Sequence, residues 1–168
     1  SDEISLSPTT ITFTNANWDT PQMVTVTGSD DNLVDGSQTS TVTISVVTEI
    51  SDDDYDSVAD QTLSVTTSDN DTAGFTVAES SGSTEVAETG STDTFTVVLD
   101  AQPVSDVVID VESGDTGEAT VLPATLTFTS ANWDTAQTVT VSGANDDLVD
   151  GTQTTTITLT VNDGSSDN

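Results

Sequence analysis

The stretch FTSANWDT, residues 128–135, begins at the end of one alternating segment, TLTFT at 125–129, and leads into a second, TVTVSG at 138–143. Alternation of apolar and polar residues with a period of two is typical of half-buried β-strands. Further alternating segments are DTFTVVLD at 93–100, VVIDV at 107–111 and TTTITLTV at 154–161. Because no segment of useful length has a helical period, the pattern predicts an all-β antiparallel sandwich.

The alternation also predicts which side chains face the core. One strand would direct Phe95, Val97 and Leu99 inward, and another would direct Ile157, Leu159 and Val161 inward. Threonine would cover the outer face, where its β-branched side chain suits the pleat and its hydroxyl stays hydrated.

The Asn-Trp-Asp phrase occurs twice, as FTNANWDT from Phe13 and as FTSANWDT from Phe128, 115 residues later. At the same spacing LVDG at 33–36 returns at 148–151, and the match runs from about residue 3 to about residue 48. This period is close to the size of one sandwich domain of about 100 residues. The repeat therefore predicts about one and a half modules of ~115 residues.

The predicted module boundaries do not coincide with the two ends of the sequence. Residues 1–72 would be the C-terminal half of a first module, and residues 73–168 most of a second module without its last strand. That last strand is TLSVTT in the first module, at 62–67. Two arrangements would complete the modules: a longer polypeptide carrying the missing strands covalently, or neighbouring identical subunits that add strands head to tail.

Trp18 and Trp133 each lie between an inward Phe of one strand and an inward Val pair of the next (Phe13 with Val24 and Val26; Phe128 with Val139 and Val141). The favoured interpretation is a large ring that closes one end of the sandwich, with Asn and Asp shaping the turn. A platform on which a sugar stacks is the alternative.

The charge is one-sided: 30 acidic residues and no Lys, Arg or His give a net charge of −30. Nucleic acids and anionic membrane surfaces repel such a chain, so neither is an expected partner. The sequence has no cysteine and no apolar run long enough to span a membrane. Without His, Lys, Arg or Cys, few groups remain for catalysis, and we expect no enzyme activity.

The acids gather in predicted loops: SDDNLVDG at 29–36, ISDDDYD at 50–56, TSDNDTAG at 67–74 and ANDDLVDG at 144–151. Neighbouring carboxylates repel one another unless they are solvated, protonated or bridged by a cation. Oxygen ligands suit Ca²⁺, whereas zinc and copper prefer His and Cys. Composition alone leaves a Ca²⁺ site and a solvated acidic surface equally open.

Two narrower hypotheses concern individual loops. DNLVDG resembles half of an EF-hand loop, but Leu33 takes the third position and Val42 the twelfth, where a bidentate Glu is required, so an EF-hand is rejected. Asp52, Asp54 and Asp56 offer ligands for a further ion, although a solvated turn is favoured there.

The Trp phrase followed by an acidic loop, the strand-ending TSDND and the E-x-G of VAETG together resemble the Calx-beta domain, in the form found in tandem in large bacterial secreted and surface proteins. The resemblance covers essentially the whole chain. It implies a seven-stranded immunoglobulin-like sandwich that binds Ca²⁺ at one end, and a location outside the cell or on its surface.

The resemblance also implies the ligands. In the first module they are Glu3, Asp30, Asp31, the Leu33 carbonyl, Asp35, Asp69 and Asp71, and in the second Glu88, Glu118, Asp146, the Leu148 carbonyl and Asp150. Gln38 and Gln153 stand where the family has Glu, which implies weaker binding or fewer ions.

Two function classes follow. The leading one is a Ca²⁺-stiffened structural segment of an extracellular adhesin stalk or cell-surface filament, with neighbouring repeats or identical subunits as partners. The alternative is a module that binds a carbohydrate or a protein. A repeated, Thr-covered surface favours the structural class, whereas exposed aromatic residues would favour binding.

Overall fold

The computed structural model describes residues 3–146, 148–149, 151–164 and 166, and it is all-β. Every strand pairing is antiparallel, and the one helical segment in this part of the chain is a 3₁₀ turn, η1 (Asp53–Tyr55). No helix among these residues is long and apolar enough to cross a membrane. The chain forms two compact units, one of Ser1–Asp31 with Asp35–Asn70 and one of Asn32–Val34 with Asp71–Asn168.

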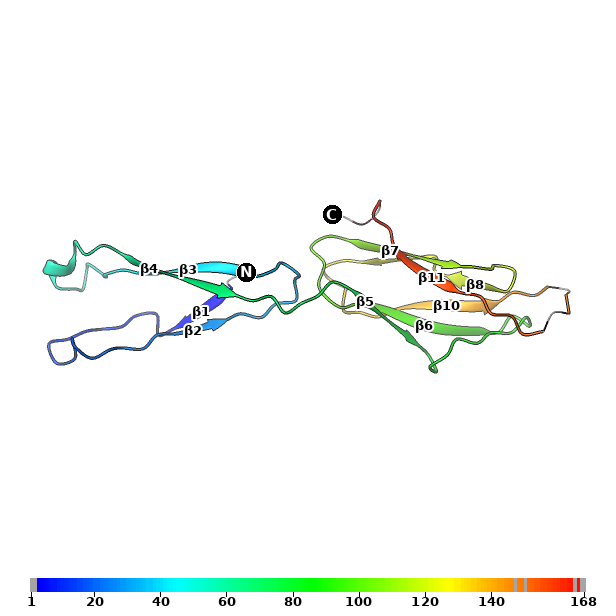
Figure 1. Cartoon of the computed structure of the whole chain (residues 1–168), viewed down its shortest axis with the longest axis horizontal. Helices are drawn as coiled ribbons and strands as arrows, with labels where there is room; N and C mark the ends of the chain where they lie inside the picture. The colour runs from blue at the N-terminus through cyan, green and yellow to red at the C-terminus, as the bar shows by residue number, and fades with distance from the viewer. Residues whose placement is uncertain (1–2, 147, 150, 165, 167–168) are drawn as a thin grey trace. The chain divides into compact units, whose positions relative to one another are not determined.

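The second unit contains two antiparallel sheets. One has the strand order β5-β6-β10-β8 and the other the order β11-β7-β9. Figure 1 labels most of these strands. The bounds are β5 (Phe75–Glu79), β6 (Thr92–Leu99), β7 (Val107–Ser113), β8 (Ala119–Leu122), β9 (Thr125–Phe128), β10 (Gln137–Gly143) and β11 (Ile157–Val161). The predicted alternating segments are therefore strands of this unit.

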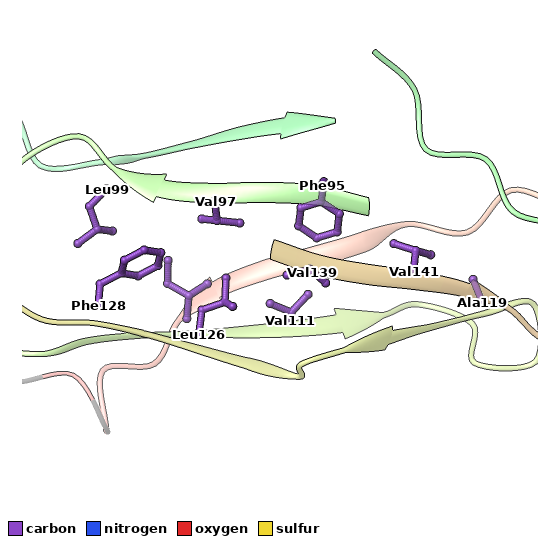
Figure 2. Close-up of a cluster of buried hydrophobic side chains, with 10 residues drawn as sticks. Phe95, Val97, Leu99, Val111, Ala119, Leu126, Phe128, Val139 and Val141 are labelled. Atoms are coloured by element: carbon purple, nitrogen blue, oxygen red, sulfur yellow. The ribbon is translucent and has the colours of Figure 1, made fainter. Parts of the chain in front are cut away.

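The core of the second unit lies between its two sheets. Phe95, Val97 and Leu99 of β6 face Leu126 and Phe128 of β9 across this space (Figure 2). The other buried members come from β7, β8 and β10 (Ile109, Val111, Ala119, Val139, Val141). The arrangement is consistent with a β-sandwich, because each sheet contributes one apolar face to a shared interior.

The predicted inward residues of β6 are confirmed, since Phe95, Val97 and Leu99 are buried. On β11, Ile157 and Leu159 are partly buried and pack against the core, while Val161 is 40% exposed. The inward prediction for Val161 is therefore wrong: this residue ends the strand, beyond the part of β11 that packs against the core.

The link between β9 and β10 is the FTSANWDT phrase, and hydrogen bonds explain its residues. Asn132 Oδ1 accepts the backbone N–H of Thr129 (2.6 Å) and its hydroxyl (3.1 Å). Gln137 Nε2 donates to the Thr127 carbonyl (2.7 Å). The Trp133 carbonyl accepts the N–H of Leu99 (3.1 Å), and its ring packs against the core.

The first unit contains two separate two-stranded sheets. Strand β1 (Ile4–Ser7) pairs with β2 (Thr25–Gly28), and β3 (Gln38–Ile44) pairs with β4 (Gln61–Thr67). Among the described residues of this unit, Val42 is the one buried hydrophobic residue. Burial in this unit is therefore slight.

The predicted burial of the first Trp phrase is wrong. Phe13 is 52% exposed, Trp18 70% and Val24 39%. Residues 10–13 form no strand, although their counterparts in the second unit form β9. The physical reason is pairing: β9 is hydrogen-bonded to β7, and no described strand of the first unit takes the place of β7.

Candidate metal centre

Three carboxylates of the first unit lie close together: Glu3, Asp31 and Asp35. One carboxylate oxygen from each lies within 4.8 Å of the others, with Glu3 and Asp31 partly buried and Asp35 exposed. Within the described ranges this is the group that offers three ligand atoms at metal-binding separation.

Strand pairing brings these residues together. Ile4 of β1 is opposite Gly28 of β2, which places Glu3 beside the loop that follows β2. The Glu3 carbonyl accepts the N–H of Ser29 (2.8 Å) and the Thr67 hydroxyl at the end of β4 (3.2 Å). Glu3 therefore lies where one sheet meets the last strand of the other.

The loop before β3 is shaped by two further contacts. Gly36, at φ 72°, donates its N–H to Asp69 Oδ2 (2.7 Å). This left-handed conformation suits glycine, because a Cβ would strain it. Gln38 Nε2 donates to the Asp35 carbonyl (2.9 Å), so this Gln holds the loop by a hydrogen bond.

The donor set fits a hard divalent cation. Two oxygens that each lie about 2.4 Å from one Ca²⁺ are at most about 4.8 Å apart, and the three carboxylate oxygens lie within this limit of one another. All three ligands are carboxylates, which Ca²⁺ prefers over the imidazole and thiolate ligands of zinc. The chain has no Lys, Arg or His to neutralise them.

This group of three does not include the other carboxylates predicted as ligands of the first module, Asp30, Asp69 and Asp71. Asp30 precedes Asp31 and is exposed, and Asp69 bonds to Gly36 as described. Leu33 and Asp71 are counted with the second unit, where Leu33 forms a parallel bridge with Gln102. Their roles as ligands stay predictions.

The second unit repeats one of the backbone hydrogen bonds that position Glu3 in the first unit. Ala144 donates its N–H to the Glu118 carbonyl (2.9 Å), as Ser29 does to Glu3. Asp146 Oδ1 accepts the N–H of Leu148 (2.9 Å), and the Leu148 side chain is exposed. Glu88 and Glu118 line one cleft, while Asp150 lies outside the described residues.

Two carboxylates that the sequence analysis did not single out have structural roles. Asp93 accepts the Ser80 hydroxyl (2.6 Å) and the N–H groups of Glu85 (2.9 Å) and Thr94 (2.7 Å). The Ser80 bond first, and then the two backbone bonds, lower the pKa of Asp93 below its ordinary value. Asp100 accepts the Thr76 hydroxyl (2.8 Å). Their positions at the two ends of DTFTVVLD were the available signal.

The Asp52–Asp56 loop forms the η1 turn. Asp52 is its N-cap and accepts the N–H of Asp54 (3.0 Å), and the residues of the turn are exposed. This geometry accounts for Asp52 as a capping residue.

No protein-family model, curated protein or solved structure matches this chain. The Calx-beta resemblance therefore rests on the sequence motifs alone.

Proposed function

We propose that this chain is a structural segment of repeated β modules that Ca²⁺ stiffens. The observation that carries the proposal is the cluster of Glu3, Asp31 and Asp35. The proposed setting is an adhesin stalk or filament at the cell surface, with further repeats or identical subunits as neighbours and no catalytic role.

The cluster supports stiffening because of where its members come from. Glu3 precedes β1 of one sheet, whereas Asp35 precedes β3 of the other. An ion bound to both would connect two sheets that share little buried surface. It would also neutralise carboxylates that otherwise repel one another, so both effects favour the folded first unit.

The test is thermal unfolding of the chain with chelator and with millimolar Ca²⁺, at matched ionic strength because salt alone screens repulsion. Ca²⁺ at about 100 times its dissociation constant should add roughly 2.7 kcal/mol to the stability of the first unit. Asp35→Asn should reduce this gain, while Asp60→Asn, an exposed carboxylate outside the cluster, should keep it. Equal curves with chelator and with Ca²⁺ would contradict the proposal.

A second candidate function is carbohydrate binding at Trp18, and the 70% exposure of its side chain favours it. An exposed indole ring offers an apolar face on which a sugar can stack. Titration with soluble oligosaccharides while Trp fluorescence is followed tests this function, and Trp18→Phe should abolish any response. The equivalent Trp133 packs against the core, which supports a packing role for the phrase.

A further inference from the structure

Strand β11 is the last strand in its sheet, whose order is β11-β7-β9. Thr156 accepts the N–H of Gly114 (2.8 Å), and Asn162 donates to the Val108 carbonyl (2.8 Å). In an antiparallel pair, residues alternate between bonding to the partner and pointing away from it. The even-numbered residues of β11 therefore face β7, and the backbone groups of Ile157 and Leu159 point to the other edge.

A cleft accompanies this edge. Its apolar lining includes Val77 of β5, Phe95 of β6, and Ile157 and Leu159 of β11. Strand β5 is the edge of one sheet and β11 the edge of the other. The cleft therefore lies on the side of the sandwich where these two edge strands lie, and the partly buried Ile157 and Leu159 line it.

The chain itself shows which kind of strand fits beside β11. By the 115-residue repeat, Val42 of β3 corresponds to Ile157 of β11. In the first unit β3 pairs with β4, and Val42 is opposite Leu63. The same register beside β11 would place Leu63 opposite Ile157 and Gln61 opposite Leu159.

The negative charge of the cleft also favours an uncharged strand. The cleft is lined by four carboxylates, Glu79, Glu85, Glu88 and Glu118. Strand β4, QTLSVTT, has no charged residue, so it would add no repulsion on docking. Its apolar residues, Leu63 and Val65, alternate as a half-buried strand requires.

Strand β4 is weakly held in its own unit. Its sheet has two strands, a size that is marginally stable in water, and Leu63 is 53% exposed. Exchange of such an element between copies costs little and is a known route to association.

We propose that the edge of β11 and the cleft beside it form a docking site for one further strand, and that this strand is β4 of a second copy of the chain. This deepens the proposed function by naming the partner of the structural segment, but it requires no metal ion. Each copy would have one donor strand and one acceptor edge, so association would be head to tail and would not close into a dimer.

The test measures amide hydrogen exchange in ¹⁵N-labelled chain mixed with excess unlabelled chain. Chelator is present throughout, so the result does not depend on whether the chain binds Ca²⁺. About 0.5 M NaCl shortens the Debye length to about 4 Å and screens repulsion between copies. Exchange at Ile157 and Leu159 should slow by at least about tenfold. Thr158, which faces β7, is the internal control and should change less.

Unlabelled Leu63→Asp chain should not protect these amides, because its β4 would place a charge in the cleft. A synthetic peptide, QTLSVTTS, separates an effect on docking from misfolding of that variant. It should protect Ile157 and Leu159, and the peptide with the same substitution should not. No protection by either donor would overturn the docking site. Protection by the peptide but not by unlabelled chain would overturn the second copy as its source.

Discussion

At the scale of single residues, one phrase has two environments. Thr14 and Asn17 repeat the turn of Thr129 and Asn132, with Asn17 Oδ1 accepting the Thr14 N–H (2.5 Å). Gln22 Nε2 donates to the Thr12 carbonyl (2.7 Å), as Gln137 does to Thr127. The local turn is thus the same, yet Trp18 is exposed and Trp133 packs against a core. Local hydrogen bonds set the turn, and neighbouring strands set the burial.

The different environments of Trp18 and Trp133 predict that their substitution by Ala lowers stability by different amounts. Trp133→Ala should destabilise the second unit by about 2 to 4 kcal/mol, because a ring that contacts the core is removed. Trp18→Ala should change stability by less than about 0.5 kcal/mol, as for an exposed site. Urea unfolding of both variants measures the difference, and equal losses would contradict the environments described.

The lowered pKa of Asp93 predicts that its contribution to stability depends on pH. Its pKa in the folded chain lies below the ordinary value of 3.8. Its contribution to stability is therefore fully present above the pKa of the unfolded chain and is lost as the pH falls through the folded pKa. Asp93→Asn should be less stable than the parent at pH 7, and this difference should shrink as the pH falls through the folded pKa.

Unfolding midpoints at pH 7 and pH 2 measure how far this difference shrinks. Asp106→Asn, at an exposed carboxylate of the same unit, is the control and should follow the parent at both values. A constant difference between Asp93→Asn and the parent across this range would contradict the role of the ionised carboxylate.

At the scale of elements, corresponding strands meet different neighbours. Gly143 ends β10 and donates its N–H to the Ser91 carbonyl (3.0 Å). A Cβ on Gly143 would lie 2.1 Å from the Ala87 carbonyl oxygen. Its counterpart, Gly28, ends β2, and a Cβ there would meet the Thr67 methyl at 3.4 Å. Glycine is therefore required by close backbone packing in one strand and not in the other.

Substitution of Gly143 and of Gly28 by Ala tests this difference in packing. Gly143→Ala should destabilise the second unit by about 1 to 3 kcal/mol, because backbone atoms must move to admit the methyl group. Gly28→Ala should lie within about 0.5 kcal/mol of the parent. Thermal unfolding compares them, and tolerance of Gly143→Ala would show that the Ala87 segment packs less closely than described.

At the scale of the whole molecule, the two units differ in how much apolar surface they bury. The second unit has a core between two sheets, whereas the described part of the first unit buries Val42 alone among its hydrophobic residues. Apolar burial is the main favourable term in folding, at about 25 cal/mol per Å². The second unit should therefore supply most of the stability of the chain.

Hydrogen exchange tests this difference in chelator. Amides of Ile109 and Val139 should exchange at least about 100-fold more slowly than those of Val42 and Val65, because local opening requires less free energy where little surface is buried. Uniform protection in both units would show that the first unit is closed by contacts of its own.

Much of the fold follows from patterns in the sequence. Alternation predicted β6, β7, β9, β10 and β11, because a period of two needs only one buried face. The segment that forms β4 was predicted as the last strand of the first module. By the 115-residue repeat, β8 corresponds to β1 and the end of β10 to β2. In the candidate site, the acidic loops were visible in the sequence and the Calx-beta resemblance implied Glu3 as a ligand; the binding of Ca²⁺ by these residues stays a prediction.

The sequence by itself determined the alternating segments, the turns and the acidic loops, since local hydrogen bonds and alternation act over a few residues, whereas an alternating segment becomes a strand only where a partner strand pairs with it. Tertiary structure alone decided that Phe128 is buried while Phe13 is exposed, and that Glu3 lies near Asp31 and Asp35. The physical reason is that burial and ligand geometry depend on strands distant in sequence. Two nearly identical phrases therefore have different surroundings, because β7 pairs with the strand before one of them and no described strand pairs with the residues before the other.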